Sequence, residues 1–196
     1  MKFSELEISQ LIKAWAVIAL AFTIASTIGA GRSLGQDSEA IGTFLRIFFL
    51  SSLTVGLAFL LHELAHKFIA EKYGCWAEFR SFDLGLILAV IMSFAGFIFA
   101  APGAVVISGV VSTSENGKIA AAGPITNLVL AGLFLFIGSF ITSGGWLAEL
   151  SFYGVEINAW LAVFNLIPFG PLDGVKVIRW NSFVWILLIG TGFLLL

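Results

Sequence analysis

Two histidines and a glutamate stand within one pentad, His62-Glu63-Leu64-Ala65-His66, and the 196-residue chain has no other histidine. Positions four apart on a helix differ in direction by about 40°, so both imidazoles would lie on one face and could bind one metal ion. Glu63 lies about 100° round the helix from His62, where it reaches a metal-bound water better than the metal. The pattern therefore predicts a hydrolytic metal centre with Glu63 as the general base.

Sequence spacing alone leaves several candidates for the third metal ligand. A catalytic zinc ion takes three protein ligands and leaves one position open for water. With no histidine left, the third ligand must be a carboxylate or the lone thiol, and the candidates are Glu71, Cys75, Glu78, Asp83 and Asp173. Asp173 follows a proline- and glycine-rich break in an apolar segment, where unwound backbone could direct a carboxylate into a cavity, although Asp before Gly is also common in turns. Two imidazoles and a carboxylate suit Zn²⁺ best, while iron or cobalt could also bind.

The composition limits the class of protein that carries this pentad. Hydrophobic residues make up 59% of the chain and charged residues 11%, and the mean hydropathy is +1.04. Soluble domains average about 25% charged residues, so a soluble fold, a disordered chain and a disulfide scaffold are all excluded. The net charge of -2, without a basic tract, gives no support for nucleic-acid binding. We expect a multi-pass membrane protein.

Apolar runs long enough for membrane helices occupy residues 11–30, 41–70 and 120–141, with further runs at 152–167 and 182–196. The last run would span only if its helix began near Val175. Residues 84–111 are apolar but rich in glycine, and their end, Ala104–Ser108, is typical of a strand. Residues 112–118 are expected to form a polar turn. The predicted fold class is an all-α polytopic membrane protein with about five to six transmembrane helices and a re-entrant or short β segment near residues 84–111.

Basic residues indicate the orientation, because Lys and Arg concentrate on the cytoplasmic side. If the N-terminus is cytoplasmic and residues 84–111 do not cross, the cytoplasmic residues include Lys67, Lys72, Arg80, Lys176 and Arg179. A single crossing by residues 84–111 would move the last two outside. The charge rule therefore favours an active site towards the cytoplasmic side.

Three segments together resemble the site-2 protease family, the M50-type intramembrane zinc metalloproteases. They are the His62–His66 pentad, Gly123-Pro124-Ile125-Thr126-Asn127, and the segment from Asn165 through Pro168 and Pro171 to Asp173-Gly174. The resemblance covers residues 44–179 of a single domain, 1–196, without a PDZ or CBS domain. A short core without these regulatory domains suggests a prokaryotic cell membrane. It implies Zn²⁺ ligands His62, His66 and Asp173, with Glu63 as base. Asn127 and Asn165 match family asparagines near the site, where they would bind substrate or pack between membrane helices.

The resulting expectation is an intramembrane zinc metalloprotease that hydrolyses transmembrane or membrane-proximal segments of a membrane protein substrate in the lipid bilayer. The strand at 104–108 could bind the unwound substrate by strand addition. The alternatives are a non-catalytic membrane scaffold with a structural metal site and a transporter with broken helices.

Overall fold

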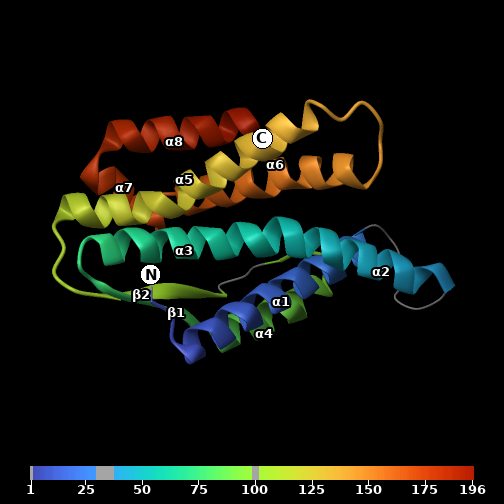
Figure 1. Ribbon diagram of the computed structural model, residues 1–196, viewed down its shortest axis with the longest axis horizontal. Coiled ribbons are helices and arrows are strands. Elements are labelled where there is room, and N and C mark those ends of the chain that lie inside the picture. Colours follow the sequence, from blue (N-terminus) through green and yellow to red (C-terminus); the bar gives the residue numbers. More distant parts are fainter. Residues whose placement is uncertain (1, 30–37, 99–101) are drawn as a thin grey trace. The chain divides into compact units, whose positions relative to one another are not determined.

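The computed structural model describes residues 2–29, 38–98 and 102–196 (Figure 1). The elements, in chain order, are α1 (Glu5–Gly29), α2 (Ser38–Ser51), the π-helix η1 (Ser52–Gly56), α3 (Leu57–Lys72), β1 (Trp76–Ser81), α4 (Asp83–Ser93), β2 (Gly103–Ser108), α5 (Thr113–Gly138), α6 (Trp146–Asn165), α7 (Asp173–Trp180) and α8 (Ser182–Leu195). The chain divides into two compact units, and each is described by itself.

Three helices in the described residues are long and apolar enough to cross a membrane: Glu5–Gly29, the continuous helix Ala40–Lys72, and Thr113–Gly138. The prediction of a mostly helical chain with helices long and apolar enough to cross a membrane is therefore confirmed. The larger number of five to six spans stays a prediction. α8 has 14 residues, or about 21 Å at 1.5 Å per residue, which is short of a hydrocarbon core of about 30 Å.

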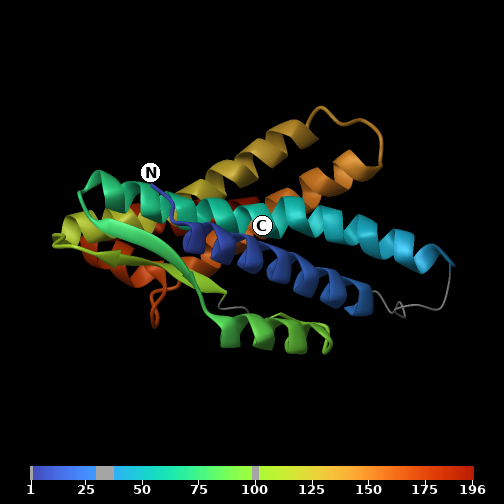
Figure 2. The same ribbon diagram turned by 60° about the horizontal axis from the view of Figure 1, so that its bottom comes forward.

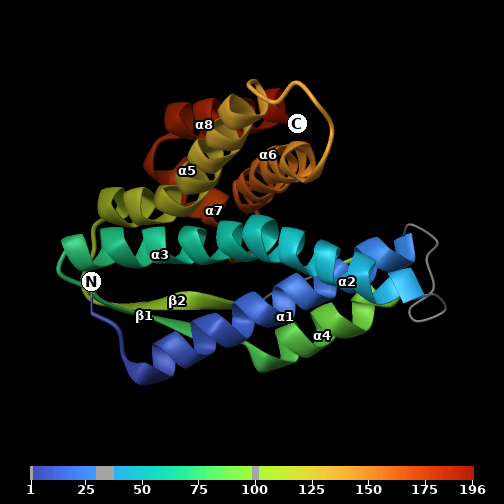
Figure 3. The same cartoon turned by 45° about the vertical axis from the view of Figure 1, so that its right-hand side comes forward.

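The first of these helices, α1, organises one compact unit, Lys2–Leu57 with Phe79–Ala104, by packing against α2, η1 and α4 (Figure 3). Its first turns carry polar side chains that bind backbone further along the chain. Buried Glu7 accepts the N–H of Phe79 at 2.9 Å, and Gln10 accepts the N–H of Ser81 at 3.1 Å. A buried carboxylate needs such a donor, because an unpaired one would be strongly destabilising.

The strands β1 and β2 form a two-stranded sheet. The strand expected at Ala104–Ser108 is confirmed as β2, whereas β1 was not predicted. Gly103 begins β2 at φ +152°, and a Cβ there would lie 2.4 Å from the carbonyl oxygen of Arg80, so only glycine allows this approach. Residues 84–111 thus contain α4 and a strand, apart from residues 99–101, which lie outside the described residues. The re-entrant path of these residues stays a prediction.

The second unit comprises Ala58–Glu78 and Val105–Leu196, and its helices α5, α6, α7 and α8 pack on one another (Figures 1 and 2). The expected polar turn at 112–118 is wrong, because α5 already begins at Thr113. Ser112 and Glu115 form a capping box, each side chain accepting the other's backbone N–H, and this starts the helix despite its polar composition. Small residues allow close packing here: a Cβ on Gly154 would lie 2.3 Å from the Phe134 ring.

The predicted break before Asp173 is confirmed, since α6 ends at Asn165 and α7 begins at Asp173. A Cβ on Gly174 would lie 2.1 Å from the Leu166 carbonyl oxygen, so the start of α7 packs tightly on the end of α6. The requirement that a final spanning helix begin near Val175 is not met. The chain bends at Asn181, whose side chain accepts the N–H groups of Phe183 and Val184 and starts α8 anew.

Candidate metal centre

His62 and His66 lie one turn apart on α3, and both side chains are buried. Their rings meet edge to face, with centroids 4.7 Å apart. The predicted helix and shared face are therefore present. Both Nε2 atoms point towards the same carboxylate, that of Asp173.

Asp173 is the first residue of α7, so the break in the chain places its carboxylate against α3. Its Oδ2 lies 3.4 Å from Nε2 of His62 and 3.1 Å from Nε2 of His66. Two ligand atoms held tetrahedrally about 2.0–2.2 Å from one zinc ion are themselves about 3.3 Å apart. The spacing of the three ligand atoms fits a zinc ion, and they form a candidate metal-binding group among the described residues.

Hydrogen bonds on the far sides of the rings fix which nitrogen of each histidine faces Asp173. Nδ1 of His62 donates to Oδ1 of Asn127 at 2.5 Å, and Nδ1 of His66 donates to the Ile119 carbonyl oxygen at 2.8 Å. Since the carbonyl can only accept, Nδ1 of His66 must carry the hydrogen. A neutral histidine with Nδ1 protonated presents the lone pair of Nε2, the form that binds a metal.

Gly123 on α5 has no side chain and so leaves space beside the Nε2 atoms of His62 and His66. A Cβ built on Gly123 would lie 2.5 Å from Nε2 of both His62 and His66. An ion bound to both nitrogens would also lie close to each of them, because zinc–nitrogen bonds are about 2.0–2.1 Å, so a side chain at position 123 would crowd the two ligand atoms. The side chains present and the missing side chain of Gly123 therefore fit a bound metal ion.

The electrostatic surroundings favour a carboxylate ligand. Burial raises the pKa of Asp173, but the positive charge and hydrogen bonds of His66 and His62 in their protonated forms lower it by more, so the pKa lies well below its usual range. A cation bound between the neutral rings would act on the carboxylate in the same direction. The Nζ of Lys176, one turn along α7, lies 3.6 Å from the other carboxylate oxygen, Oδ1. Asp173 is thus ionised over the whole physiological pH range.

Glu63 is buried beside His62 and His66 on α3, and its carboxylate is held by backbone. Its Oε2 accepts the N–H of Val105 in β2 at 3.0 Å. One edge of β2 therefore faces the predicted general base. This contact is invisible in the sequence, because 42 positions separate the two residues.

The other carboxylate and thiol candidates are outside the His62–His66–Asp173 group. Glu71 pairs with buried Lys67 at 3.1 Å, and Asp83 binds Lys13 at 2.6 Å. Cys75 is buried, and a Cβ on Gly109 would lie 2.8 Å from its Sγ. Among the alternatives left by spacing, the geometry favours Asp173.

The two asparagines occupy different surroundings. Asn127 is fully buried behind His62, whereas Asn165 is half-buried at the end of α6 and donates to the carbonyl of Leu161, one turn back. A substrate-binding role for either stays a prediction. Asn158 on α6, which sequence reasoning missed, bonds to Asn127.

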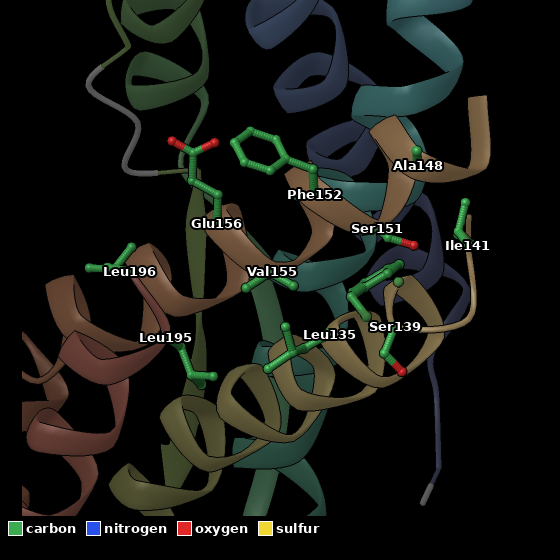
Figure 4. Close-up of a pocket in the computed structure, with 12 residues that line it drawn as sticks. Leu135, Ser139, Ile141, Ala148, Ser151, Phe152, Val155, Glu156, Leu195 and Leu196 are labelled. Carbon is green, nitrogen blue, oxygen red and sulfur yellow. The ribbon is translucent and has the colours of Figure 1, made fainter. Parts of the chain in front are cut away.

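A separate hollow of about 570 Å³ lies further along α5, with walls from α5, α6 and the end of α8 (Figure 4). Its lining is mostly apolar and includes Leu135, Phe152 and Leu196, with the polar side chains of Ser139, Ser151 and Glu156 also present. Phe134, also in the lining, is 11 residues beyond Gly123, or about 16 Å along the helix. This hollow is therefore distinct from the metal centre.

Two of the known proteins to which this chain is similar are named as zinc metalloproteases. The chain is 45% identical over 141 residues to the protein named "Putative zinc metalloprotease MJ0611" of Methanocaldococcus jannaschii, covering 71% of this chain and 74% of that protein. It is 30% identical over 145 residues to "Putative zinc metalloprotease YwhC" of Bacillus subtilis, covering 65% and 66% of the two chains. No family model and no solved structure matches. The chain belongs to the family of zinc metalloproteases that includes MJ0611, and zinc is its metal.

Proposed function

We propose that this protein is an intramembrane zinc metalloprotease of the site-2 type, which cleaves transmembrane or membrane-proximal segments of membrane proteins. The observation that supports this most is the convergence of His62, His66 and Asp173, with Glu63 on the same helix. All four are buried in a unit whose α3 and α5 belong to helices long enough to span a bilayer. These features support cleavage at the level of the bilayer.

The chemistry divides between the metal and the chain. Bound zinc would lower the pKa of a coordinated water and polarise the scissile carbonyl. His62, His66 and Asp173 would hold the ion, and Glu63 would accept a proton from the attacking water and pass it to the leaving amine. A structural zinc site more often has four protein ligands, so three ligands beside a glutamate favour hydrolysis over the scaffold alternative.

A transmembrane substrate must unwind before attack, because its backbone amides are bonded within its own helix. The edge of β2 that faces Glu63 offers the unwound segment replacement partners. Backbone groups alternate in direction along a strand, so Ile107 presents its N–H on the same edge as Val105. Ile107→Pro should therefore lower cleavage without lowering zinc content. Unchanged cleavage by this variant would contradict strand addition.

We place the site towards the cytoplasm, since Lys67 and Lys72 follow the pentad at the end of the Ala40–Lys72 helix. The deciding experiment measures zinc in detergent-purified wild type, His62→Ala and Asp173→Ala. About one zinc per wild-type chain, lost or weakened in both variants, supports the three-ligand site. A wild type that neither contains zinc nor takes it up overturns the proposal.

Cleavage is then assayed in liposomes that hold the protein and a panel of single-span model substrates. Glu63→Gln is the matched control, because it keeps the size of the side chain and removes the base. Zinc retained with cleavage lost identifies the protease. Zinc retained with no cleavage of any substrate by the wild type favours the structural-metal alternative.

A further inference from the structure

Behind the metal centre, two fully buried asparagines form a chain of hydrogen bonds that joins three helices. Asn127 on α5 accepts from Nδ1 of His62 at 2.5 Å, and its Nδ2 donates to the Ala58 carbonyl on α3 and to Oδ1 of Asn158 on α6, both at 3.1 Å. Asn158 in turn donates from Nδ2 to the Gly154 carbonyl at 2.8 Å. This series of hydrogen bonds therefore begins at the proposed metal ligand His62 and ends on the backbone of α6.

The direction of each bond follows from its two ends. The carbonyl oxygens of Ala58 and Gly154 can only accept, so the amide nitrogens of both asparagines must face them. The Oδ1 of Asn127 is then left to face His62, and Nδ1 of His62 must carry the hydrogen. Asn127 thereby selects the His62 tautomer whose Nε2 lone pair faces Asp173 and the space beside Gly123.

Packing alone does not account for this arrangement. An amide without partners in apolar surroundings is costly, and a leucine of similar shape would fill the same space between membrane helices without that cost. Both amide hydrogens and the oxygen of Asn127 are engaged by fixed groups. Direct binding of substrate by Asn127 would require one of these bonds to break.

We propose that Asn127 and Asn158 are positioning residues of the metal centre. Asn127 fixes the tautomer and ring orientation of His62, and Asn158 holds the Asn127 amide in the required direction. This inference rests on the proposed zinc site and adds the groups that orient one of its ligands. Such outer groups typically change metal affinity by about 10- to 100-fold when removed.

The test measures zinc affinity of the full-length protein in detergent by competition with a chromophoric chelator. Asn127→Leu keeps the size and removes the acceptor, so zinc affinity should fall by about 10- to 100-fold. Asn127→Asp keeps an oxygen facing Nδ1 of His62 but loses the two hydrogens that bind Ala58 and Asn158. Its zinc affinity should therefore fall by less than the roughly 10-fold lower limit expected for Asn127→Leu. Asn158→Leu should cause a smaller loss than Asn127→Leu. Asn116→Leu, at an exposed position on the same helix, should have no effect.

A purely structural role predicts the opposite order, because leucine suits an apolar interior and a buried aspartate does not. The positioning role is overturned if Asn127→Leu binds zinc as tightly as wild type, or if Asn127→Asp binds as weakly as Asn127→Leu. If Asn127→Leu does not fold, unaltered affinity in Asn158→Leu or a large loss in Asn127→Asp overturns it. A wild type without zinc affinity overturns the proposed function itself, which distinguishes the two failures.

Discussion

Gly123→Ala should displace the metal while leaving the fold in place. The added methyl carbon would lie 2.5 Å from Nε2 of both His62 and His66. Since ordinary contact begins at 3.4 Å, each nitrogen would have to retreat by about 0.9 Å, the difference between the two distances. Alanine itself favours the helix over glycine by about 0.5–1 kcal/mol, so α5 should still form.

The loss of zinc affinity can be estimated from the rotamer strain and the lost hydrogen bonds of the two imidazoles. Forcing a side chain off its rotamer costs about 0.5–1.5 kcal/mol, and losing a hydrogen bond costs a similar amount. Two rings that leave their rotamers and their Nδ1 bonds, to Asn127 and to the Ile119 carbonyl, therefore lose about 2–6 kcal/mol. At 1.4 kcal/mol per tenfold, zinc should bind about 30-fold to 10⁴-fold more weakly.

The assay compares zinc content and chelator competition for wild type, Gly123→Ala and Gly132→Ala. Gly132 is on the same helix, and a Cβ there would meet nothing within 4 Å, so its variant tests the helix effect alone. Gly132→Ala should bind zinc like wild type. If monodisperse Gly123→Ala binds zinc within about threefold of Gly132→Ala, the assignment of the ion to the space beside Gly123 is wrong.

Three further predictions concern the base, a helix start and a surface pair. Glu63→Gln should keep zinc and lower cleavage by about 10²- to 10⁴-fold, measured as single-turnover rates in liposomes; equal rates would contradict the base role. Ser112→Ala removes the N-cap of α5 and should lower the free energy of unfolding by about 1 kcal/mol, measured in urea, whereas Thr113→Ala should not. A hydrogen bond from Lys13, and a smaller effect of one from Ser81, lower the pKa of Asp83. The Lys13–Asp83 pair therefore stabilises the fold near neutral pH, and this stabilisation is lost as the pH falls through the lowered pKa. The melting temperatures of Asp83→Asn and wild type should therefore converge in acid, and a constant difference would contradict this.

The sequence was sufficient for the parts of this protein that depend on local periodicity. Helical spacing predicted that His62 and His66 share a face of one helix, and two prolines with two glycines predicted the break before Asp173. The sequence-based prediction of a polar turn at 112–118 was wrong, because a capping box starts α5 there despite the polar composition. Sequence reasoning also missed β1, a short strand whose only partner in the described sheet is distant β2.

Choosing among the candidate third ligands needed the tertiary structure, because spacing alone could not say which carboxylate returns to α3. The break supplies Asp173 from 107 positions beyond His66, and only packing brings its oxygen within 3.1 Å of Nε2. The Asn127–Asn158 chain and the Val105 contact with Glu63 are equally long-range. The sequence therefore shows which residue types could bind zinc. It does not show how these side chains are oriented, because the hydrogen bonds that orient them come from helices and a strand that meet only in the folded chain.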